Sequence, residues 1–102
     1  MTKYLILWKM DQNRIPEDPV EIMKRDEMFM SMIKEDMENG KTLEWGMFAG
    51  GRTAGYVICE GTEMEVTMEN MKYIPYVRMK SYPVLGPAQV EEMMKLSQEA
   101  MG

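Results

Sequence analysis

Aromatic rings and two cations are the residues of this chain whose types and spacing suggest chemistry. They alternate with other residues along apolar runs, so strand geometry would bring them to one face of a sheet. Tyr and Trp rings stack on flat molecules, and neighbouring cations attract an anion. The sequence predicts a surface that binds a small aromatic or anionic molecule, made of Tyr4, Trp8, Trp45, Tyr56, Arg78 and Lys80. The alternative is that the rings fill a subunit interface and the cations reach its solvated rim.

Several catalytic mechanisms are excluded because the sequence contains no histidine. His-ligated zinc or haem, Ser-His-Asp catalysis and Cys-His catalysis all need an imidazole. No Cys-x-x-Cys, Walker loop or Gly-x-Gly-x-x-Gly occurs in the sequence either. We therefore expect no cofactor and no metal. The 15 methionines suit either flexible core filling or an adaptable binding surface.

Charge and cysteine content limit the partners and the compartment. A net charge of −5 with scattered cations argues against nucleic acid and anionic membrane surfaces, and no apolar run approaches the ~20 residues of a membrane span. Cys59 is the single cysteine, and the sequence starts with a strand-like segment instead of the basic and apolar regions of a secretory signal. We expect a cytoplasmic protein in which Cys59 is a small buried hydrophobe, since no basic neighbour is evident in its strand.

Local signals predict four strands and three helices in one domain over residues 1–102. The strands are expected at residues 3–10, 42–49, 53–60 and 77–85. Asp18 caps the first helix and Gly40 ends it. Thr62 opens the second helix in a capping box, and Gly86-Pro87 opens the third. This order predicts an α+β, ferredoxin-like βαββαβ fold with an antiparallel 4-1-3-2 sheet plus a C-terminal helix.

The first strand sets the packing problem, because residues 4–8 are all large and apolar and so point to both faces of the sheet. We expect helices to cover one face and a second subunit the other. Since rings with polar tips suit a wet cavity, Tyr4, Ile6 and Trp8 are assigned to the partner side. Leu5 and Leu7 are then assigned to the helix side.

Gly50-Gly51 predicts a two-residue hairpin turn, because such turns need positive φ at both central residues. Pairing across this turn sets Trp45 opposite Tyr56, on the partner side. It sets Gly46 opposite Gly55 beneath the helices, next to Cys59. The two glycines leave either room for a substrate or space for a helix to approach closely.

Asp26 is the one acidic residue near the middle of the apolar arc predicted for the first helix. A carboxylate there lies either in a cleft, where it can act as an acid or base, or at an overhanging helix end, where it reaches water or a Lys. The arc itself consists of Ile22, Met23, Phe29, Met30, Ile33 and Met37.

The hairpin at residues 45–60 and the segment Pro83-Val84-Leu85 resemble the dimeric α/β barrel superfamily. Within it, the chain most resembles an uncharacterised branch of small proteins. The resemblance implies a homodimer in which two sheets close an eight-stranded barrel. Members include cofactor-free and haem-degrading monooxygenases, muconolactone isomerases and stress-induced proteins of unknown activity. Haem degradation is not expected here, because Cys59 stands where those members carry a tryptophan.

Three functions follow from these observations. A homodimer that binds or senses a small aromatic or anionic molecule uses every feature named above. A cofactor-independent monooxygenase or isomerase on a small aromatic or quinoid compound would need Asp26, Tyr56 or Arg78 to move protons. A structural or partner-binding dimer needs no site at all. Fold kinship alone does not choose among them.

Overall fold

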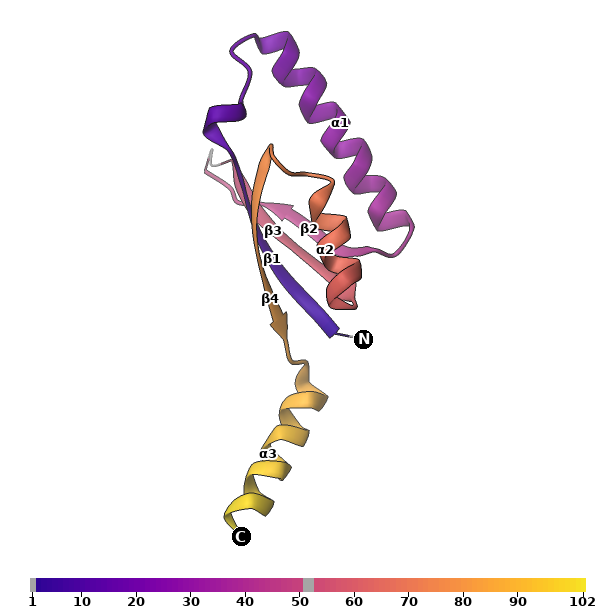
Figure 1. Ribbon diagram of the computed structural model, residues 1–102, viewed down its shortest axis with the longest axis vertical. Helices are drawn as coiled ribbons and strands as arrows, with labels where there is room; N and C mark the ends of the chain where they lie inside the picture. Colours follow the sequence, from indigo (N-terminus) through magenta and orange to yellow (C-terminus); the bar gives the residue numbers. More distant parts are fainter. Residues whose placement is uncertain (1, 51–52) are drawn as a thin grey trace.

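Four antiparallel strands form the sheet around which the chain folds, in a computed structural model that describes residues 2–50 and 53–102 (Figure 1). The order across the sheet is β2-β3-β1-β4. The α+β class and the strand order predicted from the sequence are therefore confirmed. The strands are β1 (Thr2–Met10), β2 (Thr42–Met47), β3 (Ala54–Gly61) and β4 (Val77–Val84).

The helices begin and end where the local signals predict. The Asp18 carboxylate accepts from the Val20 backbone N–H at 3.0 Å, at the start of α1 (Pro19–Glu38), and Gly40 follows with φ 75°. Thr62 and Glu65 form a capping box at α2 (Glu63–Met71), whose hydrogen bonds lower the pKa of Glu65. The third helix is α3 (Pro87–Met101), and a short 3-10 turn spans Gln12–Arg14. No helix in the described ranges is long and apolar enough to cross a membrane.

The helix side of the sheet holds the core, because α1 and α2 both lie on that face (Figure 1). Tyr4, Ile6 and Trp8 point to this side and are buried, with Ile6 only 2% exposed. They pack against Val66 of α2 and Phe29 of α1. The predicted assignment of Tyr4, Ile6 and Trp8 to the partner side is wrong: the helices take the bulkiest residues of β1, and Leu5 and Leu7 face away.

The hairpin register differs from the prediction by one residue. Trp45 lies opposite Val57, and Gly46 lies opposite Tyr56. A shift of one residue moves a side chain to the other face, so Trp45 points to the helix side and Tyr56 to the open side. The predicted turn at Gly50-Gly51 falls partly on Gly51, which lies outside the described residues.

The third helix stands apart from the rest of the chain. It continues from the end of β4 and extends away from the sheet, and it contains no buried residue (Figure 1). Its apolar side chains Val90, Met93 and Met94 are exposed. The radius of gyration is 17.2 Å, whereas a compact domain of this length has about 13 Å.

Removing side-chain volume at Ile6 should test which face of β1 is the core. We expect Ile6→Ala to lower the free energy of unfolding by about 2 to 5 kcal/mol, because the missing side-chain atoms leave a cavity between the sheet and the helices. Urea unfolding at low protein concentration measures the loss. Met28→Ala is the matched control, because Met28 is 47% exposed on α1. Equal losses in both variants would contradict the assignment of Ile6 to the core.

Candidate functional site

A cavity of about 680 Å³ separates the two helices α1 and α2 from the sheet. Its volume falls within the range of about 300 to 1,000 Å³ that is typical of small-molecule sites. Most of its lining is apolar or aromatic, and its charged residues are five acids and two cations: Asp26, Asp36, Glu60, Glu65, Glu69, Arg25 and Lys41. The residues that the argument below uses are Trp8, Arg25, Phe29, Asp36, Trp45, Glu69 and Tyr73.

Two stacked indoles form one wall of the cavity. The rings of Trp8 and Trp45 lie 5.6 Å apart between centroids with 9° between their planes. Gly55 makes room for this arrangement: a Cβ there would collide with the Gly46 carbonyl oxygen and come within 2.6 Å of the Trp8 ring. The Trp8 indole N–H is buried and has no hydrogen-bond partner among the described residues. The two stacked rings therefore contribute aromatic surface to the lining of the cavity.

Arg25 enters the cavity from α1. Its guanidinium carbon lies 5.8 Å from the centroid of the Phe29 ring, and its Nη1 donates to the Arg14 carbonyl oxygen at 3.0 Å. The Asp26 carboxylate lies 3.9 Å from Nη2, too far for a hydrogen bond. The Nε–H of Arg25 is buried and has no partner among the described residues. Arg25 thus brings a fixed positive charge to the cavity wall.

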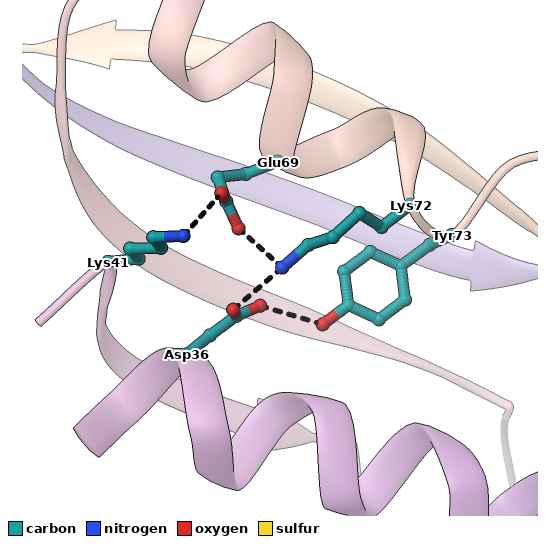
Figure 2. Close-up of polar contacts among 5 residues, drawn as sticks. All are labelled: Asp36, Lys41, Glu69, Lys72 and Tyr73. Carbon is teal, nitrogen blue, oxygen red and sulfur yellow. Dashed lines mark hydrogen bonds and ion pairs between the residues drawn. The ribbon is translucent and has the colours of Figure 1, made fainter. Parts of the chain in front are cut away.

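A network of five polar side chains joins α1, α2 and the start of β2 (Figure 2). Asp36 is its buried member at 4% exposed, and it accepts from Lys72 Nζ at 2.7 Å and from the Tyr73 hydroxyl at 3.0 Å. Lys72 also lies 2.7 Å from Glu69, which lies 3.2 Å from Lys41. Every charge in the network faces an opposite charge, so the cluster fastens the C-terminal ends of α1 and α2 together.

Two groups of this network bind their protons more tightly than usual. Burial raises the pKa of Tyr73, and the negative charge of Asp36 adds to the rise. Burial lowers the pKa of Lys72, but hydrogen bonds to Asp36 and Glu69 outweigh that effect and hold the pKa above its ordinary value. At neutral pH Tyr73 is therefore a neutral phenol and Lys72 a charged ammonium.

The six predicted ligand residues divide between two faces of the sheet. Trp8 and Trp45 line the cavity on the helix side. Tyr4 is on the same side but packs with Cys59 and Val66 in the core. The other three lie on the open side: Tyr56, Arg78 and Lys80. The prediction of a single shared surface is wrong, because β1 faces the other way and the hairpin register is shifted.

The open face has an aromatic pair of its own. The Tyr56 hydroxyl donates to Glu44 at 2.7 Å, and this hydrogen bond raises the pKa of Tyr56. Its ring stacks with Phe48 at 6.4 Å between centroids and lies over Gly46, where a Cβ would come within 2.5 Å of the ring. Gly46 and Gly55 therefore do not face each other, and each accommodates an aromatic ring on a different face.

The buried acidic residue of α1 is Asp36, which the sequence pattern did not single out. Asp26 borders the cavity but is exposed, which agrees with the alternative that its carboxylate reaches water, whereas Asp36 is buried with Phe29 and Ile33. Arg25, Phe29, Ile33 and Asp36 follow one another at helical spacing, so they share the inward face. That spacing was visible in the sequence, but the methionines on the neighbouring positions made a different arc look more apolar.

Two further features bear on the chemistry. Burial raises the pKa of the Cys59 thiol, and the charge of Glu69 adds to the rise, as the prediction of an unreactive buried thiol requires. Among the described residues, no group of three or more Cys, Asp or Glu side chains is placed to hold a metal ion.

No protein-family model matches the chain, and no curated protein matches it. The resemblance to the dimeric α/β barrel superfamily therefore stays a prediction. The arrangement of the sheet and its two covering helices is compatible with a ferredoxin-like subunit.

Replacing Tyr73 should reveal the network through the alkaline pH dependence of stability. At pH 7 we expect Tyr73→Phe to lower the free energy of unfolding by about 1 kcal/mol, because Asp36 loses a hydrogen bond. A group whose pKa is raised by folding stabilises the fold below its unfolded pKa, about 10 for Tyr, and that contribution falls as the pH rises further.

Wild type should therefore lose stability above pH ~10 more steeply than the Tyr73→Phe variant. Urea midpoints at a series of pH values measure the difference. Tyr76→Phe, which removes the hydroxyl of an exposed tyrosine outside the network, is the control and should follow wild type. Parallel pH curves for wild type and Tyr73→Phe would contradict the buried network.

Proposed function

We propose that this chain is a homodimeric protein that binds a small, flat aromatic or anionic molecule in the cavity between α1 and the sheet. The observation that carries the proposal is the stacked pair Trp8 and Trp45 at the wall of a cavity of about 680 Å³. Indole faces offer a planar aromatic body an apolar surface at little entropic cost. Arg25 adds a positive charge at the same cavity. Asp36, Glu69 and Tyr73 of the polar network also line this cavity.

The homodimer is supported by the apolar and charge pattern of the open sheet face. Leu7 and Tyr82 are 38% and 46% exposed there, a combination that favours cover by another surface. The charges are unequal across the face. The β1 and β4 half carries Lys3, Lys9, Arg78 and Lys80, and the β2 and β3 half carries Glu44 and Glu60.

Two such faces are self-complementary. A two-fold axis that runs between two facing sheets, parallel to the strands, sets the β4 half of one over the β2 half of the other. Cations then meet carboxylates from both sides, as an isologous interface requires. This is the dimeric α/β barrel that the sequence resembles. The exposed apolar stripe of α3 is a second surface that a partner copy would cover.

A second candidate is a cofactor-independent monooxygenase or isomerase acting on a small aromatic or quinoid compound. The observation that favours it is the hydrogen-bonded pair Tyr73 and Asp36 beside the same cavity, since such groups can hold or move a proton. The third function, a structural or partner-binding dimer, has no use for the cavity.

For each of these functions the single thiol Cys59 suits a reducing compartment, and we propose the cytoplasm.

Ligand binding should appear as thermal stabilisation and as a change in tryptophan fluorescence. We expect a flat bicyclic compound such as 2-naphthoate, at 100 times its Kd, to add about 2.7 kcal/mol to the free energy of unfolding. Trp45→Leu should weaken binding by about tenfold because one face of the stack is lost. Tyr82→Phe on the open face is the control.

A panel of flat aromatic compounds that neither shifts the melt nor alters fluorescence would leave only the structural or partner-binding dimer. Oxygen uptake or isomerisation of a bound hydroquinone during the same titrations would instead favour the second candidate.

A charge placed in the middle of the open face should break the dimer. We expect Leu7→Asp to convert the dimer to a folded monomer, because an unpaired carboxylate would be buried between the two sheets. Sedimentation equilibrium measures the mass, and far-UV circular dichroism checks the fold. Met23→Asp, on the exposed outer side of α1, is the control and should stay dimeric. A wild-type monomer at high concentration would rule out the barrel.

A further inference from the structure

The charged side chains at one end of the cavity are held in pairs. Asp36, the buried one, accepts hydrogen bonds from Lys72 and Tyr73 at 2.7 and 3.0 Å. Glu69 lies 3.2 Å from Lys41 and 2.7 Å from Lys72. Two carboxylates therefore face two ammonium groups in this part of the structure, and the four charges balance one another.

The other charged residues of the lining also have partners within the chain. Glu65 belongs to the capping box of α2, where its carboxylate accepts a backbone N–H at 3.1 Å. Asp26 is exposed beside Arg25, with 3.9 Å between the carboxylate and the guanidinium. Glu60 lies opposite Lys3 in the ladder of β1 and β3, where opposite charges attract. The lining therefore holds no charge that needs a ligand to balance it.

This arrangement disfavours ligands of either charge. An anion would lose its hydration and find the cations of the lining engaged, among acids that outnumber them five to two. A cation would have to displace Lys41 or Lys72 from the carboxylate that each already holds. An uncharged molecule has neither cost, and the large apolar share of the lining offers it contact surface.

The apolar part of the lining suits more than one shape of molecule. Its volume of about 680 Å³ lies in the range of sites for drug-sized ligands. Methionine side chains are flexible and fit irregular outlines, and surfaces rich in them accept varied partners. Six methionines line the cavity beside the two stacked indoles: Met10, Met30, Met47, Met64, Met68 and Met79.

From these observations we propose that the cavity selects its ligand more by charge than by shape. It binds uncharged, largely apolar aromatic molecules and discriminates against the carboxylate and the ammonium of the same ring system. This inference rests on the proposed binding function and narrows its ligand to uncharged aromatic compounds. The indoles and methionines supply the contact surface, and the paired charges around them supply the discrimination.

The first experiment compares three probes of one ring system on the wild-type protein. 2-Naphthamide is neutral at pH 7, 2-naphthoate is an anion and 2-naphthylmethylamine is a cation. Isothermal titration calorimetry gives the three dissociation constants. We expect the amide to bind at least about tenfold more tightly than either ion, because an unpaired charge loses its hydration in the cavity. The isomer 1-naphthamide should bind within about threefold of 2-naphthamide, because the methionines adapt to it.

The second experiment locates the binding and the discrimination. Trp45→Leu should weaken all three probes by about tenfold and keep their ratios, since the indole contacts the rings common to them. Glu69→Gln leaves Lys41 without its carboxylate, so the advantage of 2-naphthamide over 2-naphthoate should fall at least about threefold. The affinity for the amide should stay unchanged, which checks that this variant is folded. Glu63→Gln removes the same charge from the exposed start of α2, outside the lining, and should keep the wild-type ratio.

The outcomes separate this inference from the proposed function. Equal binding of the three probes, or tighter binding of either ion, would overturn the selection by charge while leaving the cavity as a binding site. A wild-type ratio in Glu69→Gln would overturn the role of the paired charges, and probes that Trp45→Leu does not weaken would bind elsewhere. Failure of all probes and of the wider panel of flat compounds to bind would overturn the proposed function, and this inference with it.

Discussion

The strand β1 constrains everything else in this molecule, because Tyr4 through Trp8 give it large apolar side chains on both faces. The helices resolve that constraint on one side only, where Ile6 is buried between the sheet and the helices. The other side keeps Leu7 partly exposed in a single copy. The open face, with its self-complementary charges, is the surface that the proposed partner copy would cover.

Local chemistry was sufficient to predict the elements and their order. Asp18, Gly40 and Thr62 act within a few residues of themselves, so their caps and stops follow from the sequence. The two faces of β1 could not be decided that way, since alternation says which residues share a face but not which face meets the helices. The polar tips of Tyr4 and Trp8 suggested a wet side, yet their large rings supplied the bulk that the core needed.

The hairpin shows why the candidate site was only half predictable. Two glycines at the turn and a regular ladder predicted one register, while the strands contain an irregularity between Thr42 and Glu44 and pair one residue out of that register. Because side chains alternate, that single step divided Trp45 from Tyr56 and made two aromatic clusters out of one. Gly46 and Gly55 then serve as platforms beneath Tyr56 and Trp8, a role that depends on the register and is not visible in composition.

The inward face of α1 contains two charged residues, and their presence there is the strongest support for a binding role of the cavity. A helix that only packs on a sheet places apolar residues at every inward position, but this one places Arg25 and Asp36 there, one on either side of Phe29 and Ile33. Burial of polar groups is tolerated where partners compensate it, and Asp36 has two. Arg25 is compensated only in part. Its buried Nε–H has no acceptor among the described residues, and an unpaired buried donor lowers the stability of the fold.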